Sequence, residues 1–252
     1  HALNVGCEAA RGKYMVFASA HVLPAARTWL SRLTAPFKDP LVAVVYGRQK
    51  GDPHSKYPEQ KDFWRLFSKT PHNSKVPLYY ANNANAAIRK ELWEKEKFDE
   101  YLFGLEDIDW ARRMAAKGFL IHYAPDAVVY HLHKETWPQV FNRYRREAIA
   151  AVRIGLLHPP QSGLGLGWFI QRILGDTWGS RDWSLTRLEE ILRFRYYQWK
   201  GSRVGWKQGR QLLSKLERRD MPVPIENTVV KITGPHHAAI LNMPLPELAP
   251  GD

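Results

Sequence analysis

The first half of the chain alternates short apolar runs of strand length with segments whose apolar residues recur at helical spacing. This alternation restricts the fold, because strands and helices in turn pack as a sheet covered by helices. We therefore predict an α/β fold with a mostly parallel sheet and flanking helices, and a ligand site beyond the carboxyl ends of its strands. The apolar runs cover residues 14–18, 41–46, 119–123 and 127–130.

The pattern changes after His133, where helical spacing with basic residues between the apolar positions continues to residue 219. We expect two helices after residue 184, over 185–197 and 201–216, and three glycines weaken the second. The predicted organisation has an α/β unit over 1–133, a basic, Trp-rich helical extension over 134–219, and a tail or linker over 220–252.

Charge is concentrated in the helical extension. The chain carries a net charge of +12, and residues 134–219 alone carry +10 with six of the ten tryptophans. Such a surface suits a polyanion or an anionic membrane face, although a solvated helical face over an aromatic core gives the same pattern. One cysteine excludes a disulfide scaffold, and no apolar run is long enough to span a membrane.

The acidic segment Glu106-Asp107-Ile108-Asp109 is a candidate for catalysis, because it stands where a loop meets a predicted helix. Deprotonating a hydroxyl requires one positioned carboxylate with a tuned pKa. An acidic first turn that favours the helix dipole has the same sequence, so both interpretations remain open.

Histidines follow two of the predicted strands. His21 comes after residues 14–18, and His131 and His133 come after residues 127–130. Side chains two apart on an extended chain share a face, so the pair is spaced to hold a divalent ion. Histidines at strand ends without any metal are at least as common. Arg48 and Asn85 are weaker candidates, for phosphate and sugar hydroxyls respectively.

Five motifs in order resemble the inverting family 2 glycosyltransferases of the GT-A type, over roughly residues 1–158. One of them, YGRQ, is similar to bacterial rhamnosyltransferase-like members. On this resemblance we expect residues 1–133 to be the C-terminal part of a GT-A domain, preceded in a longer protein by the strands that hold the nucleotide base. The motifs are NVG at 4–6 with AARGKY at 9–14, YGRQ at 46–49, NAAIRK at 85–90 with FDE at 98–100, GLEDIDW at 104–110, and YAPDAVVYH at 123–131.

The resemblance implies transfer of a sugar from a nucleotide-sugar donor to an acceptor hydroxyl with inversion. It assigns the general base to Asp107, with Glu106 as its neighbour. It implies dTDP-rhamnose as donor, a glycan or lipid-linked acceptor, and a cytoplasmic enzyme peripheral to the inner face of the membrane. The remaining assignments are Ser19, His21, Arg48 and Asn85 on the donor side and Asp109 and Trp110 on the acceptor side.

The metal motif departs from the family. Ser19-Ala20-His21 stands where the family has Asp-x-Asp, so the ligands implied for a divalent cation, manganese or magnesium, are His21 and His131. Two other functions are compatible with the sequence. One is an inactive GT-A-like scaffold that binds glycan or membrane. The other is a basic nucleic-acid-binding protein, but no nucleic-acid-binding motif is present and we expect no nucleic acid.

Overall fold

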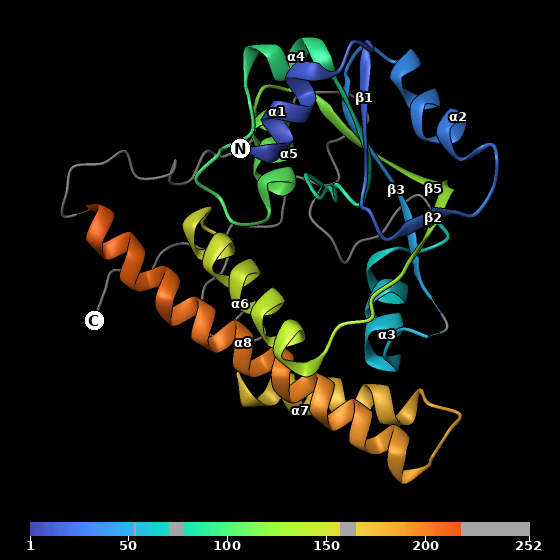
Figure 1. The fold of residues 1–252 in the computed structure, drawn as a ribbon, viewed down its shortest axis with the longest axis vertical. Coiled ribbons are helices and arrows are strands. Elements are labelled where there is room, and N and C mark those ends of the chain that lie inside the picture. Colours follow the sequence, from blue (N-terminus) through green and yellow to red (C-terminus); the bar gives the residue numbers. More distant parts are fainter. Residues whose placement is uncertain (53, 71–77, 157–164, 218–252) are drawn as a thin grey trace.

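The computed structural model describes residues 1–52, 54–70, 78–156 and 165–217 (Figure 1). The predicted tail over 220–252 lies outside these residues. A single five-stranded sheet is described, in the order β1-β4-β3-β5-β2. Its strands are β1 (Tyr14–Ala18), β2 (Val22–Pro24), β3 (Val42–Gly51), β4 (Asn85–Arg89) and β5 (Leu120–His131).

The α/β class is confirmed, but the prediction of a mostly parallel sheet is wrong. Only β3 and β5 run parallel, whereas β1–β4, β3–β4 and β2–β5 are antiparallel. Parallel neighbours require a long crossover connection. A long connection permits a parallel pair but does not require one: β3 and β4 are also far apart in the chain and run antiparallel, and β1 and β2, which follow each other directly, lie at opposite edges of the sheet. The apolar run at residues 86–88 was too short to identify β4 as a strand.

Strand β5 is continuous, where the sequence predicted two strands separated by Pro125. The register to β3 shifts instead: Gly47 pairs with Ala124, and the next residue, Arg48, pairs with Val128. This bulge brings the backbones close together, because a Cβ on Gly47 would lie 2.3 Å from the Ala127 oxygen. Glycine is therefore required at this position of the YGRQ motif.

Both faces of the sheet are covered, as the apolar run of β3 requires. Val44 and Ile88 face a core shared with α1 (Ala2–Ala9), α4 (Lys90–Lys95) and α5 (Glu106–Ala116). The neighbouring Val45 and Ala87 face the opposite core, shared with α2 (Trp29–Thr34) and the short 3₁₀ helix η1 (Ala35–Lys38). Cys7 is buried in the first core.

Asn4 joins two of the family-like segments, NVG and FDE, and also holds the Trp93 side chain. Its Oδ1 accepts hydrogen bonds from Trp93 Nε1 at 3.0 Å and from the Phe98 backbone nitrogen at 3.1 Å. Its Nδ2 donates to the Phe98 carbonyl at 2.9 Å. The amide is buried and fully used, so it fixes α1 against α4 and the loop that leads to α5.

Four further helices lie below the sheet in Figure 1: α3 (Tyr57–Leu66), α6 (Trp137–Arg153), α7 (Leu166–Trp178) and α8 (Leu185–Glu217). Helix α8 is one continuous helix of 33 residues, so the prediction of two helices is wrong. The glycines that weaken its intrinsic propensity form its contact with α6. A Cβ on Gly201 would lie 2.5 Å from the Phe141 oxygen, and one on Gly205 2.2 Å from the Arg145 oxygen.

A buried ion cluster fixes α3, α7 and α8 together. Arg195, which is fully buried, donates to Asp176 Oδ2 at 2.7 Å and to Asp62 Oδ2 at 2.6 Å. Arg65 donates to the other oxygen of Asp176 at 2.7 Å. Among the described residues, no helix combines the length and apolar character needed to cross a membrane.

Candidate active site

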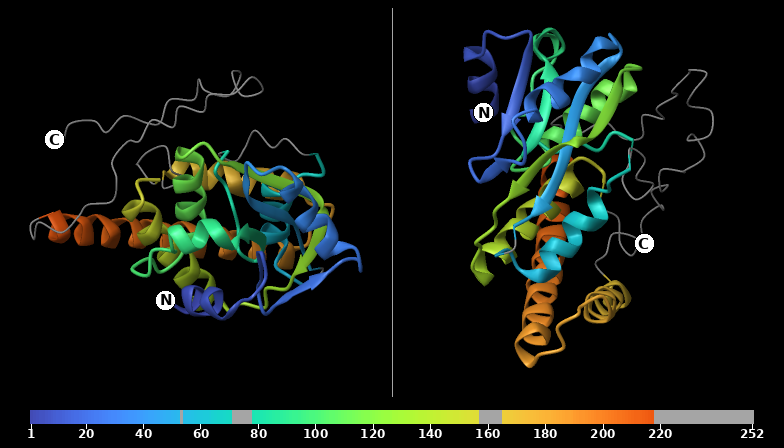
Figure 2. Two further views of the ribbon diagram at one scale, coloured as in Figure 1. Left: turned by 90° about the horizontal axis from the view of Figure 1, so that it is seen from above. Right: turned by 90° about the vertical axis from the view of Figure 1, so that its right-hand side faces the viewer.

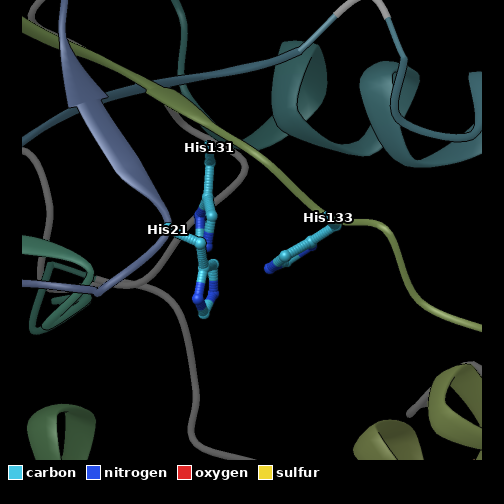
Figure 3. Close-up of side chains that lie close together, drawn as sticks. All are labelled: His21, His131 and His133. Carbon is cyan, nitrogen blue, oxygen red and sulfur yellow. The ribbon is translucent and has the colours of Figure 1, made fainter.

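Three histidines meet at one edge of the sheet (Figure 3). His21 lies in the turn between β1 and β2, His131 ends β5, and His133 lies just beyond it. The ring centroids of His131 and His133 are 4.1 Å apart, and that of His21 is 5.0 Å from His131 and 5.4 Å from His133. One nitrogen from each ring lies within 4.8 Å of the others, close enough for a single metal ion.

His131 is held in one orientation by Gln49. Its Nδ1 lies 2.7 Å from Gln49 Oε1, and because an amide oxygen only accepts, Nδ1 carries the proton. Its Nε2 is buried and has no hydrogen-bond partner among the described residues. Burial, followed by the neighbouring His133 and His21, lowers the pKa of His131 to about 3. The ring is therefore neutral at pH 7 with a free lone pair on Nε2.

His133 is oriented in the same way by a buried carboxylate. Its Nδ1 lies 2.6 Å from Glu59 Oε1, which also accepts from Arg143 at 2.5 Å. Burial opposes ionisation of Glu59, but the hydrogen bonds and charges of His133 and Arg143 outweigh it and lower the pKa. Glu59 is ionised at neutral pH and directs the other ring nitrogen of His133 away from itself.

Asp107 lies at the start of α5, where the chain turns sharply. Leu105, immediately before the helix, adopts a left-handed φ of 58°. The carboxylate accepts backbone hydrogen bonds from Asn83 at Oδ2 and from Ile108 at Oδ1, both at 2.8 Å. Burial and the adjacent Glu106 carboxylate raise its pKa to about 7, despite these hydrogen bonds. Such a pKa suits a group that takes up a proton near neutral pH.

One cleft of about 740 Å³ contains both groups. It extends from the histidine cluster at the edge of the sheet to the first turn of α5, and residues of α6 line its other side. Ser19 lies within it, and its Oγ is 3.1 Å from His21 Nε2. The polar and charged side chains in its lining include Ser19, His21, Gln49, Glu59, Glu106, Asp107, His131, His133, Arg143 and Glu147.

The structure does not bring Arg48 or Asn85 to this cleft. Asn85 is fully buried, and its amide bridges strands by donating to the Arg48 and Ala127 carbonyls at 3.2 and 2.8 Å. Successive residues of a strand point to opposite faces, so Gln49 rather than Arg48 reaches the cleft. The YGRQ motif therefore contributes through its last residue, which the sequence did not single out.

Trp110 and Asp109 are also outside the cleft lining. Trp110 is 1% exposed in the core under α5, where its Nε1 donates to the Glu96 carbonyl at 2.6 Å. Asp109 is paired with Arg113 Nε at 2.9 Å on the same helix. Both placements argue against direct contact with an acceptor. Glu59 and Arg143 were missed because neither belongs to a local motif.

The α/β fold and this cleft fit the class of protein that the sequence motifs resemble. Residues 1–150, more than half of the chain, match the family described as Glycosyltransferase like family 2. The chain therefore belongs to that family.

Among curated proteins, the chain is similar to the O-antigen chain rhamnosyltransferase RfbN of Salmonella typhimurium, with 30% identity over 141 residues. The match covers 52% of this chain and 44% of RfbN, so the chain matches less than half the length of that relative.

Two solved structures are similar in outline. The first is the mannosyltransferase PcManGT from Pyrobaculum calidifontis in complex with GDP-Man and Mn²⁺, at 18% identity and a TM-score of 0.47, covering 88% of this chain and 55% of that one. The second is GalNAc-T7 with UDP, GalNAc and Mn²⁺, at 14% identity and a TM-score of 0.43, covering 90% and 45%. At these values no residue role is transferred from either structure.

Proposed function

We propose that this protein transfers a sugar from a nucleotide-sugar donor to an acceptor hydroxyl with inversion, using Asp107 as the general base. The observation that carries this proposal is the cleft itself. It holds a carboxylate with a pKa of about 7 at one end and three clustered histidines at the other. Family membership supplies the reaction class.

In this reaction the acceptor oxygen attacks the anomeric carbon as the bond from that carbon to the diphosphate breaks. Asp107 takes the hydroxyl proton, and the diphosphate leaves with the bonding electron pair. Attack from the face opposite the leaving group inverts the configuration at that carbon. The two backbone NH groups that hold the Asp107 carboxylate fix its position for this proton transfer. Glu106, at the same helix start, raises the basicity of Asp107 through its charge.

The donor would lie with its diphosphate at the histidine cluster. His21 and His131, with Ser19 beside them, would hold a divalent cation there, and such an ion neutralises charge that develops on the leaving phosphate. The similarity to RfbN, an O-antigen chain rhamnosyltransferase by name, supports rhamnose as the sugar and a glycan as the acceptor. The dTDP carrier and a lipid-linked form of the acceptor are proposed from the sequence resemblance alone.

A second proposal concerns an anionic membrane surface, and helix α7 favours it. Its outer face is apolar and uncharged, with Leu166, Ile170, Leu174 and Trp178 exposed at intervals of four residues. Figure 2 shows α7 beside α8 and away from the sheet. Exposed basic residues follow along α8, so apolar insertion and attraction to anionic lipid would act together. The basic residues are Arg193, Lys200, Arg203, Lys207 and Arg210.

The test of the transferase follows nucleotide release and sugar transfer from a panel of UDP-, GDP- and dTDP-sugars, with a lipid-linked glycan as acceptor. We expect transfer from one donor, with inverted linkage by NMR, and its loss in Asp107→Asn. A folded protein that binds glycan but releases nucleotide from no donor would instead be the inactive scaffold.

A further inference from the structure

We infer that His21, His131 and His133 together form a three-imidazole site that selects a first-row transition metal ion, of the Zn²⁺ or Co²⁺ type, over Mg²⁺ and Ca²⁺. This inference deepens the proposed function, because it specifies the ion at the donor end of the cleft. It adds His133 as a ligand and replaces the hard-metal preference that the resemblance implied.

Two of the three rings are oriented as the rings of metal ligands are. Histidines that bind metals commonly donate their second ring NH to a carboxylate or an amide, which fixes the tautomer and the ring. His131 does this to Gln49 at 2.7 Å, and His133 does it to Glu59 at 2.6 Å. Each ring therefore directs Nε2 away from the group that holds its Nδ1, and His131 Nε2 is buried without a partner among the described residues.

The donor atoms of the cluster are all imidazole nitrogens, which sets its metal preference. Mg²⁺ and Ca²⁺ require oxygen ligands, whereas imidazole suits zinc, nickel, copper and iron. The three-histidine cluster contributes no carboxylate oxygen. A site with three protein nitrogens leaves a fourth position open, as catalytic zinc sites do, and an oxygen of a diphosphate fits that position.

A competing group, Glu59, His133 and Glu135, is also close enough to hold an ion. Its carboxylates are already paired with one arginine, because Arg143 donates to Glu59 at 2.5 Å and lies 2.7 Å from Glu135. A metal there would have to displace Arg143, which is largely buried between them. The group around His21 and His131 requires no such displacement.

The experiment measures metal binding directly, without any nucleotide sugar. The metal-free protein is titrated calorimetrically at pH 7.5 with Zn²⁺, Co²⁺, Mn²⁺ and Mg²⁺, and the Co²⁺ complex is followed by its visible absorption. We expect one Zn²⁺ or Co²⁺ per chain, with Mg²⁺ at least about 100-fold weaker. His133→Gln should weaken Zn²⁺ binding at least about 10-fold, and Gln49→Leu about 10- to 100-fold. His122→Gln, on an exposed histidine of β5, is the matched control and should bind as the wild type does.

Equal affinity for Mg²⁺ and Zn²⁺, or Zn²⁺ binding unchanged in His133→Gln, would overturn the inference. So would an equal loss of binding in His122→Gln. Circular dichroism of each variant verifies that it is folded. If His133→Gln does not fold, the Zn²⁺ affinity of Gln49→Leu tests the inference in its place. No sugar donor is present in this experiment, so a failure to bind Zn²⁺ leaves the transferase proposal intact. Conversely, a protein that binds Zn²⁺ as described but transfers no sugar would overturn only the transferase proposal.

Discussion

The backbone NH of Asn83 donates to Asp107 Oδ2 at 2.8 Å, which ties the loop before β4 to the first turn of α5. Together with the NH of Ile108, it holds a carboxylate whose pKa is raised to about 7 by burial and by Glu106. The position of the Asp107 carboxylate is therefore set by two backbone NH groups, whereas its basicity is set by burial and by Glu106. The two properties can be tested separately.

Replacing Asp107 with Asn should remove the base and leave the cleft in place. We expect the transfer rate to fall about 10²- to 10⁴-fold, the usual contribution of a positioned general base. Initial rates with saturating donor measure this. Asp126→Asn, on an exposed carboxylate of β5, is the control and should keep the wild-type rate. Equal rates in wild type and Asp107→Asn would contradict the assignment.

The raised pKa of Asp107 predicts opposite effects of pH on rate and stability. The transfer rate should increase up to about pH 7 as the base ionises. The folded state holds a proton that the unfolded chain releases above its ordinary value of 3.8, so stability from this group is lost as the pH rises from 3.8 to about 7. Thermal unfolding should show wild type losing stability relative to Asp107→Asn over that range. A constant difference would show that the pKa is not raised.

The packing of α6 against α8 predicts that Gly205→Ala is destabilising, although alanine is the better helix former. A Cβ there would lie 2.2 Å from the Arg145 backbone oxygen, so the helices must separate. We expect a loss of about 1–3 kcal/mol in the free energy of unfolding by denaturant titration. Gly6→Ala, in α1 with no atom within 4 Å of the added Cβ, should be neutral or stabilising. Similar effects at both positions would contradict the close approach.

Arg195→Met should destabilise the protein by about 3–5 kcal/mol, because it leaves the buried Asp62 and Asp176 carboxylates with less compensating charge. Arg193→Met is the matched control on the same helix. Its ion pair with Glu189 is exposed, so its loss should cost no more than about 1 kcal/mol. Urea unfolding curves measure both, and equal midpoints for the two variants would refute a role for the cluster in holding α3, α7 and α8 together.

The apolar face of α7 and the basic residues of α8 together predict binding to vesicles that contain anionic lipid, with the electrostatic part weakened by salt. Ile170→Glu with Leu174→Glu should abolish it, because both side chains are exposed and would carry charge into the lipid interface. Leu41→Glu, on an exposed leucine just before β3, is the control and should bind normally. Vesicle flotation at low and high salt measures this. Binding to neutral vesicles at high salt, unchanged in the α7 variant, would rule out this surface.

Much of the fold could be predicted from local sequence. Residues 14–18 form β1 as the apolar run predicted, and α5 begins at Glu106 and is followed by Gly118 at a positive φ of 87°. These elements depend on periodicity and on helix termini, which act within a few residues. Strand direction could not be predicted this way, because β4 pairs with two strands from distant parts of the chain.

The residues of the candidate site also fall into two groups, those that the local sequence identified and those that only the fold brought in. The sequence by itself determined the family, through ordered motifs such as NVG and FDE that the Asn4 side chain joins, and it identified Asp107, His21, His131 and His133 as candidates. Only the tertiary structure decided that the three histidines meet at one site, and that Gln49 orients His131 and Glu59 orients His133. It also decided that Trp110 is a core residue. The reason is physical: burial, pKa and ring orientation depend on residues up to about a hundred positions away, whereas a motif records only its own neighbours.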